Sequence, residues 1–116
     1  MSLSTAIRDV AGVTVIDLSG RITLGEASGK LRDTVRNLLD SGVKKMLLNL
    51  GDVSYIDSSG LGELVSAYTT ARGQGCTVKL LNVQAKVQDL LQITKLYTVF
   101  ATFEDEAAAV TSFSQA

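Results

Sequence analysis

The 116-residue sequence has the length of one globular domain, because domains most often contain about 100–150 residues. Hydrophobic residues make up 46% of the chain and charged residues 20%, which excludes an extended disordered polypeptide. Eleven basic and twelve acidic residues give a formal net charge of -1, without the basic cluster that attracts a phosphate backbone. We therefore expect a single domain over residues 1–116 with no direct nucleic-acid partner.

The sequence contains no histidine, and this absence narrows the functional classes. Histidine is the usual general base and the commonest metal ligand, so we expect no enzyme activity, no metal site and no cofactor. No apolar run approaches the roughly 20 residues that span a bilayer, which predicts a cytoplasmic protein without membrane insertion. The single cysteine, Cys76, is expected to be a small buried or half-buried side chain.

The N-terminal part of the chain predicts a hairpin followed by a helix. Leu3–Arg8 and Val13–Leu18 are runs rich in β-branched residues on either side of Ala11-Gly12, which is typical of two antiparallel strands. After Gly20-Arg21-Ile22, apolar residues recur every three or four positions, as in an amphipathic helix, up to Ser41-Gly42. The apolar positions of this helix are Leu24, Ala27, Leu31, Val35 and Leu38.

The middle of the chain predicts a strand, a helix and a second strand. Lys45–Leu50 is a nearly continuous apolar run, as in a central strand buried on both faces, and we expect a turn at Gly51-Asp52. Ser58–Arg72 has apolar residues at helical spacing and is stopped by Gly73-Gln74-Gly75. The second strand is expected at Thr77–Leu81.

The C-terminal part predicts a helix around Ala85–Ile93, a strand at Val99–Phe103 and a last helix that begins at Glu104-Asp105-Glu106. Val110 and Phe113 are expected to anchor this last helix to the sheet. Strands and helices alternate with short connections after the initial hairpin. This order predicts an α/β fold, in which about four helices cover a mainly parallel central sheet with an N-terminal antiparallel edge hairpin.

The stretch YIDSSGLG, residues 55–62, lies where a buried strand gives way to an amphipathic helix. Ser58 or Ser59 can act as the N-cap by accepting a hydrogen bond from a free backbone amide. Gly60 and Gly62 would each cost about 1 kcal/mol inside a helix, relative to alanine. Such glycines indicate close approach by a neighbouring strand or by another molecule, and we interpret the stretch as a docking surface.

Two chemical roles for this stretch are disfavoured by its residues. DSSGLG lacks the spaced glycines and the lysine of a phosphate-binding loop, and Asp57 would repel a bound anion. Serine nucleophiles need a base, and neither a histidine nor a nearby lysine is present in the sequence. An exposed serine can instead accept a phosphoryl group from another protein, which adds about -1.5 to -2 charges beside Asp57 and near Glu63.

Four segments carry a resemblance to a known family: VTVIDLSGRIT, KKMLLNLGDVSYIDSSGLGELVSAY, TVKLLNV and ITKLYTVFATFEDEAAAV. With these segments the chain resembles STAS-domain proteins, in particular the bacterial anti-sigma factor antagonists. The resemblance implies a STAS-like fold and a phosphorylation-controlled binding switch. In that family the unphosphorylated antagonist binds an anti-sigma factor that is also a serine kinase, which releases a sigma factor, and a PP2C-type phosphatase removes the phosphate.

The resemblance also implies roles for individual residues. The phosphorylated position is the hydroxyl residue directly after the aspartate, which is Ser58 here, and Ser59 is then the expected helix cap. Two positions depart from the family pattern, because Arg21 and Thr23 stand where acidic residues are common and Glu63 stands where a small apolar residue is common. The residues expected to shape or flank the docking surface are Asp57, Ser59, Gly60, Leu61, Gly62, Glu63 and Thr23.

A second function is compatible with the same resemblance. The chain would then be a STAS accessory subunit of a transporter or another regulatory complex, for example one packed on the ATPase of a lipid transporter, and would not be phosphorylated.

Overall fold

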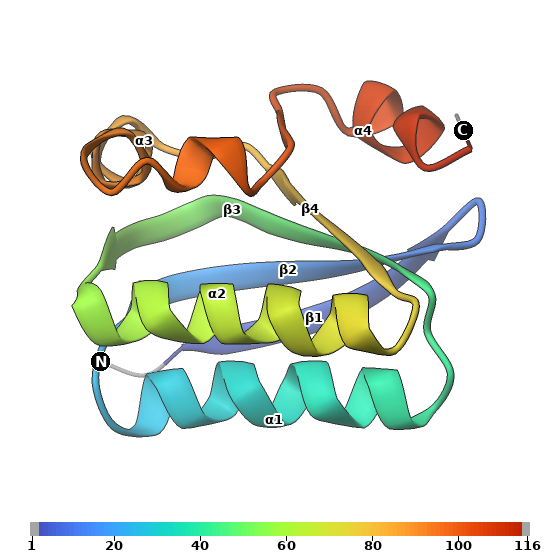
Figure 1. Cartoon of the computed structure of the whole chain (residues 1–116), viewed down its shortest axis with the longest axis horizontal. Helices are drawn as coiled ribbons and strands as arrows, with labels where there is room; N and C mark the ends of the chain where they lie inside the picture. Colours follow the sequence, from blue (N-terminus) through green and yellow to red (C-terminus); the bar gives the residue numbers. More distant parts are fainter. Residues whose placement is uncertain (1–2, 115–116) are drawn as a thin grey trace.

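The computed structural model describes residues 3–114 and contains a central five-stranded sheet in the order β1-β2-β3-β4-β5 (Figure 1). The first two strands pair antiparallel as an edge hairpin, and all other neighbouring strands pair parallel, as the sequence predicts. The strands are β1 (Ser4–Val10), β2 (Val13–Ile22), β3 (Lys45–Ile56), β4 (Thr77–Leu81) and β5 (Thr102–Phe103).

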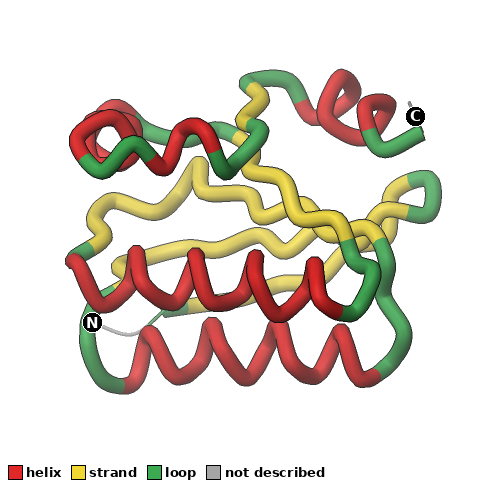
Figure 2. Tube along the Cα trace, in the orientation of Figure 1, coloured by secondary structure: helices red, strands yellow, loops and turns green. Residues whose placement is uncertain are grey.

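Within the described residues, four α-helices and one short 3-10 turn connect and cover these strands (Figure 2). The helices α1 and α2 lie side by side against one face of the sheet, and α4 lies over the opposite face (Figure 1). The elements are α1 (Glu26–Asp40), α2 (Ser58–Gly73), α3 (Ala85–Ile93), the 3-10 turn η1 (Leu96–Thr98) and α4 (Glu106–Ser112).

The alternation of side chains along the strands creates two apolar layers. In β3, Met46 and Leu48 face α1 and α2 and belong to the main core, whereas Leu47 points to the opposite face. A strand with large apolar side chains on both faces has to be buried on both, and all three of these side chains are fully buried. The smaller layer lies under α4 and contains Val13, Val15, Leu47, Leu81 and Ala109.

The prediction that the first buried strand turns at Gly51-Asp52 is wrong, because β3 continues to Ile56. The pairing of β2 with β3 shifts register after Asp17 and Asn49, so that β3 accommodates extra residues without leaving the sheet. The Asn49 side chain accepts a hydrogen bond from the Gly51 amide at 3.0 Å within this irregular part. Val53 and Ile56 are buried beyond it.

Two predicted boundaries near the C-terminus are also corrected. The strand expected at Val99–Phe103 is shorter, because only its last two residues form β5. The 3-10 turn η1 ends directly before Val99, and Phe100 is buried in the main core. The last helix begins at Glu106 instead of Glu104, since Asp105 is extended and its side chain caps the helix by accepting from the Ala108 amide at 2.8 Å. Val110 and Phe113 pack on the smaller layer, which confirms their predicted role.

The first helix also starts later than the sequence predicts. Gly25 has a φ of 104°, a backbone conformation that favours glycine, and α1 begins only at Glu26. Leu24 therefore lies outside the helix, and 78% of its surface is exposed, so its assignment to the apolar helix face is wrong. The predicted end near Ser41-Gly42 is confirmed by the positive φ of Gly42.

Cys76 lies directly before β4 and is buried in the main core, as expected of a small apolar side chain. Burial raises the pKa of its thiol, which lowers the fraction of reactive thiolate. Within residues 3–114, no helix has both the length and the apolar character needed to cross a membrane.

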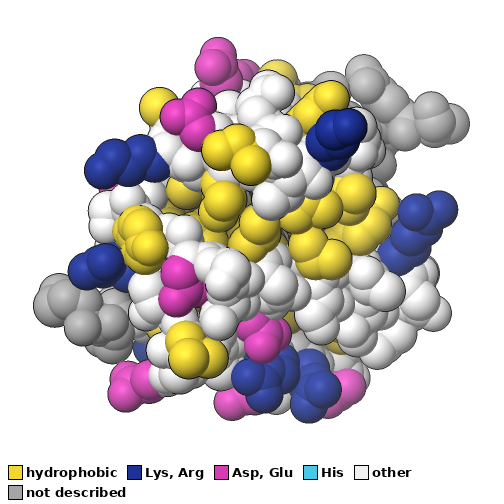
Figure 3. All heavy atoms as spheres, turned by 60° about the vertical axis from the view of Figure 1, so that its left-hand side comes forward, with side chains coloured by type: hydrophobic (Ala, Val, Ile, Leu, Met, Phe, Trp, Pro, Cys, Tyr) yellow, Lys and Arg dark blue, Asp and Glu magenta, His cyan; other side chains and the backbone are white. Residues whose placement is uncertain are grey.

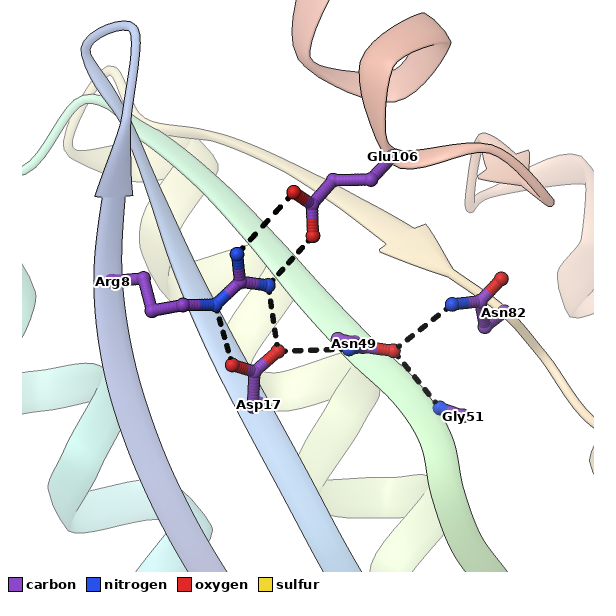
Figure 4. Close-up of polar contacts among 6 residues, drawn as sticks. All are labelled: Arg8, Asp17, Asn49, Gly51, Asn82 and Glu106. Atoms are coloured by element: carbon purple, nitrogen blue, oxygen red, sulfur yellow. Dashed lines mark hydrogen bonds and ion pairs between the residues drawn. The ribbon is translucent and has the colours of Figure 1, made fainter.

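A charged cluster holds the first turn of α4 against the hairpin (Figure 4). Arg8 in β1 donates to Asp17 in β2 at 2.6 and 3.0 Å and to Glu106 at 2.6 and 3.3 Å. Asn49 donates to the same Asp17 carboxylate at 2.8 Å. The cluster thus connects three neighbouring strands with α4, and the Arg8 guanidinium holds the pKa of Asp17 below its usual value.

Candidate docking site at the start of the second helix

The candidate site is the junction between β3 and α2, and Asp57 organises it. Asp57 has an extended backbone with φ -93° and ψ -177°, and its Oδ1 accepts from the Gly60 amide at 2.8 Å. Its Oδ2 accepts from the amide of Leu24, in the loop after β2, at 3.0 Å. These backbone hydrogen bonds, first from Gly60 and then from Leu24, lower the pKa of the Asp57 carboxyl.

The prediction that Ser58 or Ser59 caps the helix is therefore wrong. Asp57 is the N-cap, and the two serines are the first residues of α2. Aspartate caps helices as well as serine does, so the local pattern Asp-Ser-Ser does not by itself distinguish which of the three residues is the cap. As a result, neither serine hydroxyl is required for capping, and Ser58 is exposed while Ser59 is half-buried.

The two glycines of the stretch have different explanations. A Cβ built on Gly60 would lie 2.1 Å from the carbonyl oxygen of Ile22, so this glycine lets the end of β2 approach α2. A Cβ on Gly62 would meet nothing within 4 Å. The close approach at Gly60 is therefore made by a strand of the same chain, and only Gly62 faces open space.

The remaining predicted docking residues divide between the surface and the core. Gly60 and Leu61 are buried, so they shape the helix start from within and offer no side chain to a partner. Glu63 forms an ion pair with Arg32 of α1 at 3.2 Å. Thr23 is half-buried in the β2–α1 loop, and its carbonyl accepts from the Ser28 amide at 3.2 Å.

The structure adds residues that the sequence did not single out. Leu24 is largely exposed, yet its hydrogen bond to Asp57 fixes its backbone beside α2. Tyr55 is 42% exposed, and the guanidinium carbon of Arg21 lies 4.8 Å from the centre of its ring. No local pattern marks these residues, because the contacts form between the carboxyl ends of β2 and β3.

A surface hollow opens beside Ser58 between the end of β3 and α3. The hollow is lined by Tyr55 and Ser58 at the junction of β3 and α2 and by Lys86 and Leu90 of α3. Figure 3 shows this end of the molecule, where apolar side chains lie between basic and acidic ones. Within residues 3–114, no three acidic, cysteine or histidine side chains are placed together to hold a metal ion.

The STAS domain model matches residues 4–109, so the chain belongs to the STAS domain family. It is 26% identical to an anti-sigma F factor antagonist of Paenibacillus polymyxa, over 96% of this chain and 95% of the relative. It is 29% identical to the anti-sigma-B factor antagonist of Bacillus subtilis (strain 168), over 83% of this chain and 86% of the relative.

Solved structures share the fold with this chain. An anti-sigma factor antagonist from Mycobacterium paratuberculosis superposes with a TM-score of 0.85, at 21% identity, over 96% of this chain and 93% of that one. A sulfate transporter family protein from Wolinella succinogenes superposes with a TM-score of 0.71, at 16% identity, over 90% and 87% of the two chains. The predicted STAS-like fold is confirmed, and the same fold occurs in more than one functional setting.

Proposed function

We propose that the chain is an anti-sigma factor antagonist, a cytoplasmic protein-binding switch that Ser58 turns off when it is phosphorylated. In the unphosphorylated form it binds an anti-sigma factor that is also a serine kinase, and a sigma factor is released. A PP2C-type phosphatase restores the binding form. The chain itself acts as binding protein and substrate, not as an enzyme. The names of its two curated relatives support the antagonist role.

The observation that carries the proposal is that Ser58 is exposed and is not the cap of α2. Asp57 provides the helix cap, so the exposed Ser58 hydroxyl has no structural duty at the start of α2. The half-buried Ser59 is less accessible to another protein. A kinase can therefore reach Ser58 without unfolding the helix.

The transfer step assigns separate roles to the two proteins. The Ser58 Oγ attacks the γ-phosphorus of ATP, the bond from that phosphorus to the β–γ bridging oxygen breaks, and ADP leaves. The serine proton passes to a base of the kinase. Asp57 is unsuited to this task, because both of its oxygens accept backbone hydrogen bonds and its pKa is lowered.

Phosphorylation is expected to act on docking and not on the fold. The phosphate adds about -1.5 to -2 charges at an exposed helix start, next to the ionised Asp57. A partner that covers this surface would have to desolvate the new charge, which costs binding free energy. The surrounding docking surface comprises Leu24, Tyr55 and Gly62, with Thr23, Ser59 and Glu63 at its margins and Gly60 and Leu61 beneath it.

The test is phosphate transfer from ATP by an anti-sigma factor kinase of the same organism, with the modified residue located by mass spectrometry. Wild-type chain and Ser59→Ala, the matched control, are expected to take up one phosphate on Ser58, whereas Ser58→Ala takes up none. Ser58→Asp is expected to fold normally and to bind the kinase poorly. Equal phosphate uptake by Ser58→Ala would refute the site, and unchanged binding by Ser58→Asp would refute the switch.

The alternative function is that of a STAS accessory subunit that is not controlled by phosphorylation. The shared fold with a sulfate transporter family protein supports it at the level of architecture only. A pull-down from the native cell with wild-type and Ser58→Asp chains as paired baits separates the two functions. Recovery of the same transporter component by both baits would favour the accessory subunit.

A further inference from the structure

The hollow beside Ser58 is also lined by a cationic side chain. Lys86, the second residue of α3, lines this hollow together with Ser58 and Tyr55. Ser58 and Lys86 thus line the same hollow, although they are far apart in the sequence. A phosphoryl group attached to the Ser58 Oγ and directed into the hollow would share that space with Lys86.

The cations at this place are available for a new partner. The ion pairs within residues 3–114 are Arg8 with Asp17 and Glu106 and Arg32 with Glu63, so neither Lys86 nor Arg21 is engaged in one. Arg21 stacks on the ring of Tyr55, and this ring lines the hollow from the side of β3. Lys86 therefore lines the hollow itself, and Arg21 lies next to Tyr55, another residue that lines it.

The Asp57 carboxylate would repel a phosphoryl group bound in the hollow. Asp57 also lines the hollow and is ionised, but its two oxygens already accept hydrogen bonds from the amides of Gly60 and Leu24. Those amides offset part of its charge. A phosphoryl group in this hollow would meet Lys86, with Arg21 next to Tyr55, against one carboxylate whose charge is already partly offset, so the opposite charges outnumber the like charge.

We propose that Lys86, assisted by Arg21, forms a cationic site that binds the phosphoryl group of phosphorylated Ser58 within the same chain. The inference rests on the proposed function, since it assumes that Ser58 is the modified residue. Lys86 is the direct ligand, and Arg21 acts from the rim next to Tyr55. The bound phosphoryl group occupies the hollow and pairs with cations that an incoming partner would otherwise contact. The modified chain therefore offers a partner neither the open hollow nor the unpaired positive charge.

The test uses the full chain with phosphoserine introduced at position 58 by semisynthesis, so that no kinase is needed. The phosphorus NMR signal is titrated with pH, and the second pKa of the phosphate is read in wild type, Lys86→Gln and Arg21→Gln. Lys45→Gln is the matched control, because Lys45 lies at the opposite end of β3 from Ser58. Far-UV circular dichroism of each variant verifies that the fold is retained.

The expected result is a rise in the phosphate pKa of about 0.2–0.7 units in Lys86→Gln, the size that an exposed ion pair produces, with a smaller rise in Arg21→Gln and none in Lys45→Gln. Added salt should raise the wild-type pKa toward that of Lys86→Gln. Equal pKa values in wild type, Lys86→Gln and Lys45→Gln would overturn the proposal. That outcome would leave the proposed function intact, whereas failure of the kinase to modify Ser58 would refute the function without changing this titration.

Discussion

At the scale of single residues, Asp57 is the side chain that defines the candidate site. It connects three segments, because it follows β3, caps α2 through Gly60 and holds the loop after β2 through the Leu24 amide. The loop contact spans 33 residues of sequence. One carboxylate thus fixes Leu24 and the start of α2 relative to each other.

Stability should depend on the ionisation of Asp57. Its pKa is lowered in the folded chain, so its stabilising contribution is complete above the unfolded value of about 3.9 and is lost as the pH falls through the folded pKa. Asp57→Asn should lower the urea midpoint at neutral pH, and the difference from wild type should shrink in acid. Urea unfolding from about pH 6 to about pH 2 measures this. A difference that is constant over this range would contradict the ionic role.

Alanine at the two glycines of the helix start should have opposite effects. Gly60→Ala places a methyl group against the Ile22 backbone, and such overpacking typically costs about 1–3 kcal/mol. Gly62→Ala, the matched control in the same helix, meets no neighbour and should stabilise by up to about 1 kcal/mol. Urea unfolding compares the two. Equal destabilisation would show that Gly62 also faces a close neighbour.

At the scale of elements, α4 is the one whose stability depends most on its surroundings. It has seven residues, and isolated helices shorter than about 12–15 residues are marginal in water. Its supports are the Asp105 cap, the burial of Ala109 and the clamp by Arg8 on Glu106. Lys79 of β4 adds a contact at the other end, where its Nζ donates to the Ser112 hydroxyl at 2.8 Å and lies 4.7 Å from the centre of the Phe113 ring.

Removal of the arginine clamp should loosen α4 selectively. Arg8→Gln loses the ion pairs to Asp17 and Glu106, which are partly exposed and are worth about 0.2–1 kcal/mol each. Amide hydrogen exchange should become faster in α4 and remain unchanged in α2. Lys30→Gln, an exposed residue of α1, serves as the control. Unchanged exchange in α4 would show that its apolar contacts alone hold it.

At the scale of the whole molecule, the two faces of the sheet contribute unequally. The main core joins α1, α2 and α3 to the sheet, whereas the layer under α4 contains five buried residues within the described part of the chain. The candidate site lies at the carboxyl ends of β2 and β3, where Ile22 pairs with Ile56, and is built on the main-core side by α2. Its geometry is therefore supported by the larger of the two layers.

A chain that ends after Glu104 should consequently remain folded. It lacks α4 and exposes the apolar side chains of Val13, Val15 and Leu47, so its urea midpoint should fall and its binding of a hydrophobic dye should rise. Leu64→Ala in the main core is the comparison, with an expected cost of about 2–5 kcal/mol. Loss of cooperative unfolding in the shortened chain would refute the inference that the main core contributes more to stability than the layer under α4.

Local patterns in the sequence were sufficient for the elements and their order. The apolar residues of β3 and β4 and the helical spacing after Ser58 predicted these elements because each pattern depends on near neighbours. The predicted ends of helices and strands were wrong where a side chain makes a hydrogen bond that the local pattern does not indicate. Asn49 bonded to Gly51 inside a longer strand, and Asp105 capped a helix that was expected to start before it.

By itself, the sequence determined the α/β order, the buried strands and the helix start at Ser58, since alternation and helical spacing are properties of consecutive residues. Only the tertiary structure decided what surrounds Ser58. Asp57 accepts from the Leu24 amide, the Ile22 carbonyl requires a glycine at position 60, and Lys86 lines the same hollow as Ser58. These contacts join segments that are distant in sequence, and the parallel pairing of β2 with β3 and the docking of α3 bring them together, which no local pattern encodes.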